Sequence, residues 1–491
     1  MAVQERPVVV TGSGSVRGVV EGGVAAFRGI PYAASPVGER RFAAPGPHPG
    51  WSGVRDAARP GPAVPQGPSR LEAVMGRRAP DWDEDGCLTL NVWSPEPPGP
   101  SGPPAEGSSP GGRPVLVWFH GGGFSSGSGG WDWYDGRHLA AAGGLVVVTA
   151  NYRLGPLGYL HLPELGSDNL GVRDQAAVLA WVRHNIAGFG GDPEQLTVGG
   201  QSAGAYSALH LALAPETGPW IARVVTQSGP FGLPPQDPGE AADHARRFLG
   251  ILGLDRGPDP LAALRAVPPG QLLTAYGQLA RDVARPGNVA PPMYPVLGGY
   301  GLPVTWQQAL ADGRLDGKQL LTGTTRDEMT AFYAFDPAVR TATAERARAI
   351  AATLAEDGAE RYDRTAATVP RTPGDILTEV ATGLQFRDRT LAIADHHAAA
   401  GHPTYVYRFD RTPTPDPARL GATHCAELPY LFTTFDAYPD SPMLGDATPA
   451  ARTLGHAFSH AVATFAATGR PPAEHWPPYA PADPTTVRHF G

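Results

Sequence analysis

The stretch LTVGGQSAGA, residues Leu196–Ala205, decides how the chain around it can be arranged. Its first three residues favour a β-strand, and the run Ala205–Ala214 that follows favours a helix. Between them lies the pattern Gly-x-Ser-x-Gly, with Ser202 at its centre. A strand, a sharp turn and a helix around one serine are typical of a nucleophile elbow, in which a strained residue lifts its hydroxyl above the sheet. We therefore predict that Ser202 is a nucleophile.

The glycines on either side of Ser202 support this interpretation. A side chain at Gly200 or Gly204 would collide with the neighbouring strand and helix, so the turn needs bare backbone there. Five residues alone also fit an ordinary strand-to-helix connection. The β-prone and helix-prone flanks favour the nucleophile.

Other short runs have the composition of strands, and they alternate with helical patterns. Between the strand predicted at 144–151 and the elbow, Val172–Ile186 repeats apolar residues at helical spacing. This alternation predicts an α/β fold with a largely parallel sheet and right-handed crossovers. The predicted strands are 87–93, 114–119, 144–151, 196–198, 221–225, 320–321 and 404–409.

The rest of the chain is read as additions to this sheet. Two β-prone runs at 8–10 and 15–20 predict an N-terminal hairpin, and the Pro-, Gly- and Arg-rich region 45–83 reads as a surface loop. The low-complexity segment Pro95–Arg113 could be a linker between domains, but we favour a flexible loop between two strands. Helices are expected at 241–252, 260–267, 271–280, 337–356, 375–400 and 453–467. We expect one domain over 1–491, with insertions at about 231–295 and 330–400 that form a helical cap over the sheet edge.

Three consecutive glycines follow the strand predicted at 114–119, in the run His120–Phe124. Such a run is costly in backbone entropy, so something must require bare backbone there. An HGGG-type motif is the second source of oxyanion-binding N–H groups in lipases and esterases. A plain glycine turn is the alternative, and the presence of Ser202 elsewhere in the chain favours the oxyanion hole.

Composition limits the partners and the compartment. The 491 residues carry a net charge of −8, so neither nucleic acid nor an anionic membrane is expected as a partner. The two cysteines, Cys87 and Cys425, form no metal-ligand or disulfide pattern, and we expect no cofactor and no metal. The N-terminus has no signal-peptide pattern, and no stretch is apolar enough to span a bilayer. The cytoplasm is therefore the expected location.

A serine hydroxyl becomes a good nucleophile when an imidazole removes its proton and a carboxylate fixes that imidazole. In α/β-hydrolases these groups follow in the order Ser, then Asp or Glu, then His. Glu328 lies just past the strand predicted at 320–321, and His424 lies in the loop after the strand at 404–409. Because the chain has 15 histidines, spacing alone leaves this pairing open.

An ordered set of motifs runs along almost the whole chain. It comprises FRGIPYA at 27–33, EDGCLTLNVW at 84–93, HGGGF at 120–124, NYRLGPLG at 151–158, NLGVRDQ at 169–175, NIAGFGGDPEQLTVGGQSAGA at 185–205, TQSG at 226–229, TGTTRDE at 322–328, GATHCAELPYLF at 421–432 and FAATGRPP at 465–472. With these motifs the sequence resembles the type-B carboxylesterase family, which includes bacterial para-nitrobenzyl esterases and animal cholinesterases. The resemblance implies an α/β-hydrolase fold and a serine carboxylesterase that acts through an acyl-enzyme on a small neutral ester.

Carried over onto matching positions, the resemblance implies a triad of Ser202, Glu328 and His424. It also implies an oxyanion hole formed by the N–H groups of three residues and two structural ion pairs. The three oxyanion residues are Gly122, Gly123 and Ala203, and the ion pairs are Arg41 with Glu84 and Arg153 with Asp174.

Several positions depart from the family pattern, among them Gly86, an extra residue before Cys87, and Cys87 itself, which lacks the family's disulfide partner. Gln201 stands where the family usually has Glu, and Met329 stands where Gly usually follows the catalytic Glu. Cys425 takes a position after His424 where a small residue is common, and we read it as a small buried apolar residue. Trp131, Trp133 and Tyr134 follow the glycine loop and fit either the mouth of the site or the core.

Two other kinds of function stay open at this level. Relatives of the type-B family act as non-catalytic adhesion modules, although those have typically lost the nucleophile that Ser202 supplies here. Amidases, lactonases and acyltransferases use the same triad and differ in pocket and acceptor. The sequence names neither the acyl chain nor the natural substrate.

Overall fold

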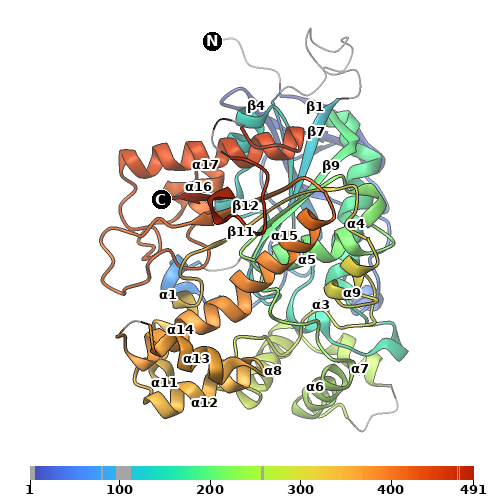
Figure 1. Cartoon of the computed structure of the whole chain (residues 1–491). Helices are drawn as coiled ribbons and strands as arrows, with labels where there is room; N and C mark the ends of the chain where they lie inside the picture. Colours follow the sequence, from blue (N-terminus) through green and yellow to red (C-terminus); the bar gives the residue numbers. More distant parts are fainter. Residues whose placement is uncertain are drawn as a thin grey trace.

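The computed structural model describes residues 6–78, 81–95, 112–255, 259–368, 370–472, 474 and 476–491. Within these residues, a twisted sheet of ten strands runs through the molecule (Figure 1). In spatial order its strands are β13 (Val487–Phe490), β12 (Thr404–Phe409), β11 (Gln319–Thr325), β10 (Arg223–Gln227), β9 (Gly191–Gln201), β7 (Arg113–Phe119), β8 (Val146–Ala150), β6 (Thr89–Ser94), β4 (Val24–Pro31) and β3 (Val19–Glu21).

In this order, the strands from β13 through β8 run parallel to one another. The strands β6, β4 and β3 continue the sheet, each antiparallel to the strand before it. The predicted largely parallel sheet is therefore correct. Because parallel strands end at the same edge, the loops after β7, β9, β11 and β12 meet there. These loops and the first residue of the helix after β9 carry all the residues that the sequence assigns to the site.

Helices cover both faces of the sheet. On one face α4 (Leu170–Asn185) and α5 (Ala203–Leu213) pack against Val117 and Val198 in a common apolar core. On the other face α2 (Arg137–Gly143), α16 (Leu428–Phe432) and α17 (Pro449–Thr468) pack with Trp118 and Val225. Neighbouring residues of one strand thus enter opposite cores, as the pleat requires.

The two segments expected as insertions are helical, and their helices up to α14 gather at one end of the molecule (Figure 1). The first segment contains α6 (Pro238–Ile251), α7 (Pro260–Ala266) and α8 (Pro269–Asp282). The second contains α10 (Thr330–Tyr333), α11 (Pro337–Arg340), α12 (Ala344–Leu354), α13 (Gly358–Ala366), α14 (Pro373–Thr382) and α15 (Asp388–Ala399).

Three details of the second segment differ from the expectation. The helix predicted at 337–356 is broken, because the Thr343 side chain accepts a hydrogen bond from Arg346 N and starts a new helix. Helix α13 was not predicted. Helix α15, joined to α14 through a π-helical turn at Gly383–Arg387, packs against β11 and β12, so this part of the segment covers the sheet.

The N-terminal region forms a second, three-stranded sheet. Its hairpin, β1 (Val8–Thr11) with β2 (Gly14–Arg17), was predicted, whereas the third strand β5 (Val54–Asp56) was not. The predicted strand 15–20 is split at Gly18, where a Cβ would lie 2.6 Å from Ala26 O.

The region 45–83 was wrongly expected to be only a surface loop. Besides β5 it contains a short helix, α1 (Glu72–Met75), and it sends apolar side chains such as Val64 and Val74 into the interior. Most of the low-complexity segment, 96–111, lies outside the described residues. In the part of the chain that the structure describes, we find no helix that is both long and apolar enough to cross a membrane.

Candidate active site

Ser202 sits between the end of β9 and the start of α5 with a backbone conformation of φ 58° and ψ −124°. A non-glycine residue rarely adopts this conformation, and such strain concentrates at functional sites. The two flanking glycines permit it: a Cβ on Gly200 would lie 2.3 Å from the carbonyl carbon of Gly204. A Cβ on Gly204 would lie 1.9 Å from Phe119 O. The predicted steric requirement for both glycines is correct.

Glu328 and His424 come from loops after different strands and meet in the interior. His424 Nδ1 lies 2.5 Å from Glu328 Oε2, and both side chains are fully buried. The other carboxylate oxygen, Glu328 Oε1, accepts a hydrogen bond from the N–H of Thr325 at 2.9 Å. Since the carboxylate accepts the Nδ1 proton, His424 Nε2 is left as the acceptor nitrogen of the ring.

Gln201 lies next to that acceptor nitrogen. Its Nε2 atom is 3.4 Å from His424 Nε2, and its Oε1 atom is 3.5 Å from Cys425 Sγ. Among the described residues the Ser202 hydroxyl makes no hydrogen bond, to His424 or to any other group. The structure thus brings Glu328 and His424 together, whereas Ser202 makes no direct hydrogen bond with either of them.

The glycine loop after β7 faces Ser202. Gly122 and Gly123 have positive φ angles of 115° and 59°, and a Cβ on Gly122 would lie 2.0 Å from Ser126 O. In the described part of the chain their N–H groups, and that of Ala203 at the first position of α5, have no acceptor. All three residues line the same cavity as Ser202. These N–H groups can therefore receive an oxygen atom of a bound molecule.

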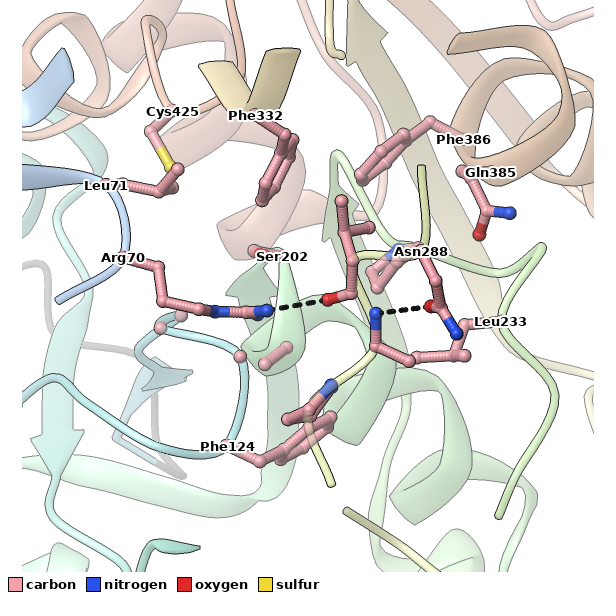
Figure 2. A pocket seen from close by; sticks show the side chains of 18 of the residues that line it. Arg70, Leu71, Phe124, Ser202, Leu233, Asn288, Phe332, Gln385, Phe386 and Cys425 are labelled. Carbon is pink, nitrogen blue, oxygen red and sulfur yellow. Dashed lines mark hydrogen bonds between the residues drawn. The ribbon is translucent and has the colours of Figure 1, made fainter. Parts of the chain in front are cut away.

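The cavity has a volume of about 540 Å³, which suits a small molecule. Its wall combines the glycine loop with residues of both helical segments, such as Leu233 and Ile350, and with Phe332 and Phe386, whose rings stand against His424 (Figure 2). Trp131, Trp133 and Tyr134 also line it, while Trp133 and Tyr134 are buried. Both readings of these aromatic residues are therefore correct, because they belong to the core and to the pocket wall.

Comparison with known proteins decides the family. The profile of the carboxylesterase family matches residues 5–489. The chain belongs to the carboxylesterase family. It is 37% identical over 484 residues to the para-nitrobenzyl esterase of Bacillus subtilis (strain 168), covering 96% of this chain and 92% of that protein. It is 34% identical over 491 residues to the phenmedipham hydrolase of Pseudarthrobacter oxydans, covering 98% and 94%.

Solved structures agree with the sequence relatives. A thermophilic para-nitrobenzyl esterase superposes with a TM-score of 0.82 at 36% identity, covering 96% of this chain and 94% of that one. A carboxylesterase of Geobacillus stearothermophilus gives a TM-score of 0.81 at 35% identity, covering 97% and 94%. The chain therefore has the α/β-hydrolase fold and is a carboxylic ester hydrolase, and a non-catalytic binding role is not favoured.

This carboxylesterase has a second buried carboxylate beside Glu328, which sequence reasoning did not assign to the site. Glu427 Oε1 accepts a hydrogen bond from Ser228 Oγ at 3.0 Å, and Oε2 has no partner among the described residues. Burial, followed by the nearby charge of Glu328, raises the pKa of Glu427 to about 7. Glu427 and Ser228 lie in two of the motifs that resemble the family, at 421–432 and 226–229. Their place in these motifs could have indicated from the sequence that they belong near the site.

The two ion pairs implied by the resemblance are present. Arg153 Nη2 lies 2.7 Å from Asp174 Oδ1, and both side chains are buried. Arg41 Nε donates to Glu84 Oε1 at 2.6 Å. These pairs are part of the interior of the esterase, because each arginine also donates to backbone carbonyl groups of distant segments.

Met329 and Cys425, which like Gln201 differ from the usual family residues, are both buried. Met329 has a φ of −76° and packs, fully buried, in the core of the second helical segment, so the site does not need a glycine there. Cys425 is buried as expected, with a positive φ of 71°, and it also lines the cavity. Burial raises the pKa of its thiol well above the usual range.

Proposed function

We propose that Ser202, His424 and Glu328 form the catalytic triad of this carboxylesterase. The observation that carries the proposal is the Glu328–His424 hydrogen bond, which leaves Nε2 as a base next to the cavity that Ser202 lines. His424 removes the Ser202 proton as the hydroxyl attacks the ester carbonyl. It then protonates the leaving alcohol, and water hydrolyses the acyl-enzyme by the same steps. Catalytic hydrogen bonds often tighten only when substrate binds, which accounts for the missing Ser202–His424 contact.

In this proposal the N–H groups of Gly122, Gly123 and Ala203 bind the oxyanion. Their support is the free donors and the positive φ angles of the glycine loop. Each preorganised donor of this kind contributes roughly 10²–10³-fold to kcat. Small esters with an uncharged alcohol are the proposed substrates, because the residue before Ser202 is the amide Gln201.

Replacement of Ser202 tests the proposal. The wild-type protein should hydrolyse 4-nitrophenyl acetate or butyrate without added metal, and Ser202→Ala should lower kcat by about 10⁶-fold. Ser13→Ala, in the turn of the β1–β2 hairpin, is the matched control and should retain activity. Near-wild-type activity of the Ser202→Ala protein would remove this residue from the mechanism.

The choice between ester, amide and lactone is tested with a substrate panel. Esters of increasing acyl length, an anilide and a lactone are compared by kcat/KM. We propose that the esters have the highest values and that the cytoplasm is the compartment, which the two unpaired cysteines support.

A further inference from the structure

The cavity that contains Ser202 is lined by three arginines and, among the described residues, by no aspartate or glutamate. Arg70 precedes α1, Arg285 follows α8, and Arg346 lies on α12. The chain as a whole carries a net charge of −8. The cavity therefore concentrates positive charge in an otherwise acidic protein.

Among these arginines, Arg70 lies against the glycine loop. Its Nη1 donates to Val289 O at 2.8 Å, and its Nη2 packs against the glycine loop, 2.7 Å from where a Cβ on Gly123 would be. Figure 2 shows the guanidinium reaching into the pocket that Ser202 also faces. Within the described ranges no carboxylate pairs with Arg70, and its Nε and Nη2 groups have no acceptor.

Among the described residues, the two arginines with buried side chains are neutralised. Arg41 and Arg153 each hold a carboxylate by hydrogen bonds. Arg70 is exposed to solvent through the cavity, and the protein packed around it lowers its pKa by desolvation. An arginine at a cavity wall without a counter-charge has free N–H donors whose hydrogen bonds a bound carboxylate can accept.

We propose that the site recognises esters that carry a second, free carboxylate, and that Arg70 binds this carboxylate while Ser202 attacks the ester. The guanidinium fork matches a carboxylate in shape and charge. Arg285 and Arg346, which are exposed on the cavity wall, add positive potential that attracts the anion. The inference rests on the proposed role of Ser202. Neutral esters stay substrates, and the carboxylate adds affinity.

The test compares a carboxylate with its uncharged isostere. Monobutyl glutarate and butyl 4-carbamoylbutanoate differ only in carboxylate and carboxamide, so their ratio of kcat/KM isolates the charge. The ratio should be about tenfold or more, because hydrogen bonds to charged groups are stronger than neutral ones. A second pair, 4-(butyryloxy)butanoate and its amide, places the carboxylate on the alcohol side and shows which side faces Arg70.

For the pair with the larger carboxylate-to-amide ratio of kcat/KM, Arg70→Gln should reduce this ratio by about tenfold or more. Arg17→Gln is the matched control, because it removes one exposed positive charge on the small N-terminal sheet, and it should leave the ratio unchanged. Raising the salt concentration should weaken the preference, since exposed charges are screened. The proposal would be overturned if the kcat/KM ratio were near or below one for both pairs. It would also be overturned if Arg70→Gln left a ratio above one unchanged.

Binding without turnover separates this proposal from the catalytic one. In the Ser202→Ala background, calorimetry should show tighter binding of the preferred carboxylate ester than of its amide, and adding Arg70→Gln should remove the difference. Equal binding of the two esters would overturn carboxylate recognition even in an active esterase. Selective binding by a protein that hydrolyses no ester would instead contradict the proposed function alone.

Discussion

Gln201 differs from the family pattern and also contacts the proposed catalytic histidine. Its amide lies against His424 Nε2 and Cys425 Sγ. Because an amide is neutral, it has no negative charge to offer a cationic substrate. Aromatic rings such as those of Trp131 and Trp133 line the cavity and could attract a cation. However, Arg78 already stands 5.4 Å from the ring centres of both Trp131 and Trp133. A cationic substrate would also meet the positive charge of the three arginines that line the cavity.

We therefore expect neutral esters to be preferred over choline esters. The measurement is kcat/KM for butyrylcholine against 3,3-dimethylbutyl butyrate, its uncharged isostere. Gln201→Glu should shift the ratio toward the choline ester, because it adds a carboxylate beside the ester site. A wild-type preference for the cation of about tenfold, worth ~1.4 kcal/mol, would show that this interpretation of Gln201 is wrong.

Glu427 predicts a pH dependence of stability. Its pKa in the folded protein is about 7, above the ordinary value of 4.5, so the native state retains a proton that the unfolded chain releases between these values. The stabilisation is complete below the ordinary pKa and is lost as pH rises through the folded pKa. Glutamine stays uncharged at every pH. The Tm of Glu427→Gln minus that of the wild type should therefore increase as the pH rises from 5 to 8.

The control for this series is Glu345→Gln, an exposed residue of α12. Its difference in Tm from wild type should not change over the same pH range. A difference for Glu427→Gln that is equally constant would mean that Glu427 is ionised in the folded protein throughout.

At the scale of elements, the junction between β9 and α5 depends on close contact between backbones. A Cβ on Gly204 would lie 1.9 Å from Phe119 O, so Gly204→Ala should force β7 and α5 apart. Overpacking of this kind costs about 1–3 kcal/mol or more in the free energy of unfolding, which urea titration would measure.

Gly250 in α6 provides the comparison for Gly204. A Cβ there meets nothing within 4 Å, and alanine is a better helix former than glycine. Gly250→Ala should therefore stabilise the protein by about 0.5–1 kcal/mol. Equal effects of the two substitutions would contradict the steric account of the elbow.

At the scale of the whole molecule, Cys87 and Cys425 are both free and buried. They lie in different apolar cores, so neither can reach the other. Burial raises the pKa of both thiols, which should make them slow to react in the native protein. Titration without reductant should find two thiols after denaturation and almost none before it. A count of zero after denaturation would contradict this prediction and the proposed cytoplasmic compartment.

The sequence alone determined the features that follow from local sterics and periodicity. The strand, turn and helix around Ser202 were predictable because only glycine fits at positions 200 and 204. Six of the predicted strands, apart from the elbow strand, correspond to β6, β7, β8, β10, β11 and β12. The strands β4, β5 and β13 were missed, because they are short or lie among prolines and glycines and depend on pairing with distant segments.

Only the tertiary structure decided which side chains share the site. Spacing left the pairing of Glu328 with His424 open among 15 histidines, and the fold joins them because parallel strands end at one edge of the sheet. The sequence did not indicate that Arg70 belongs to the site. Its segment is irregular, so no helical or strand periodicity shows which way the side chain points. Its place beside the glycine loop depends on contacts with Val289, 219 residues further along the chain, and such long-range contacts exist only in the folded molecule.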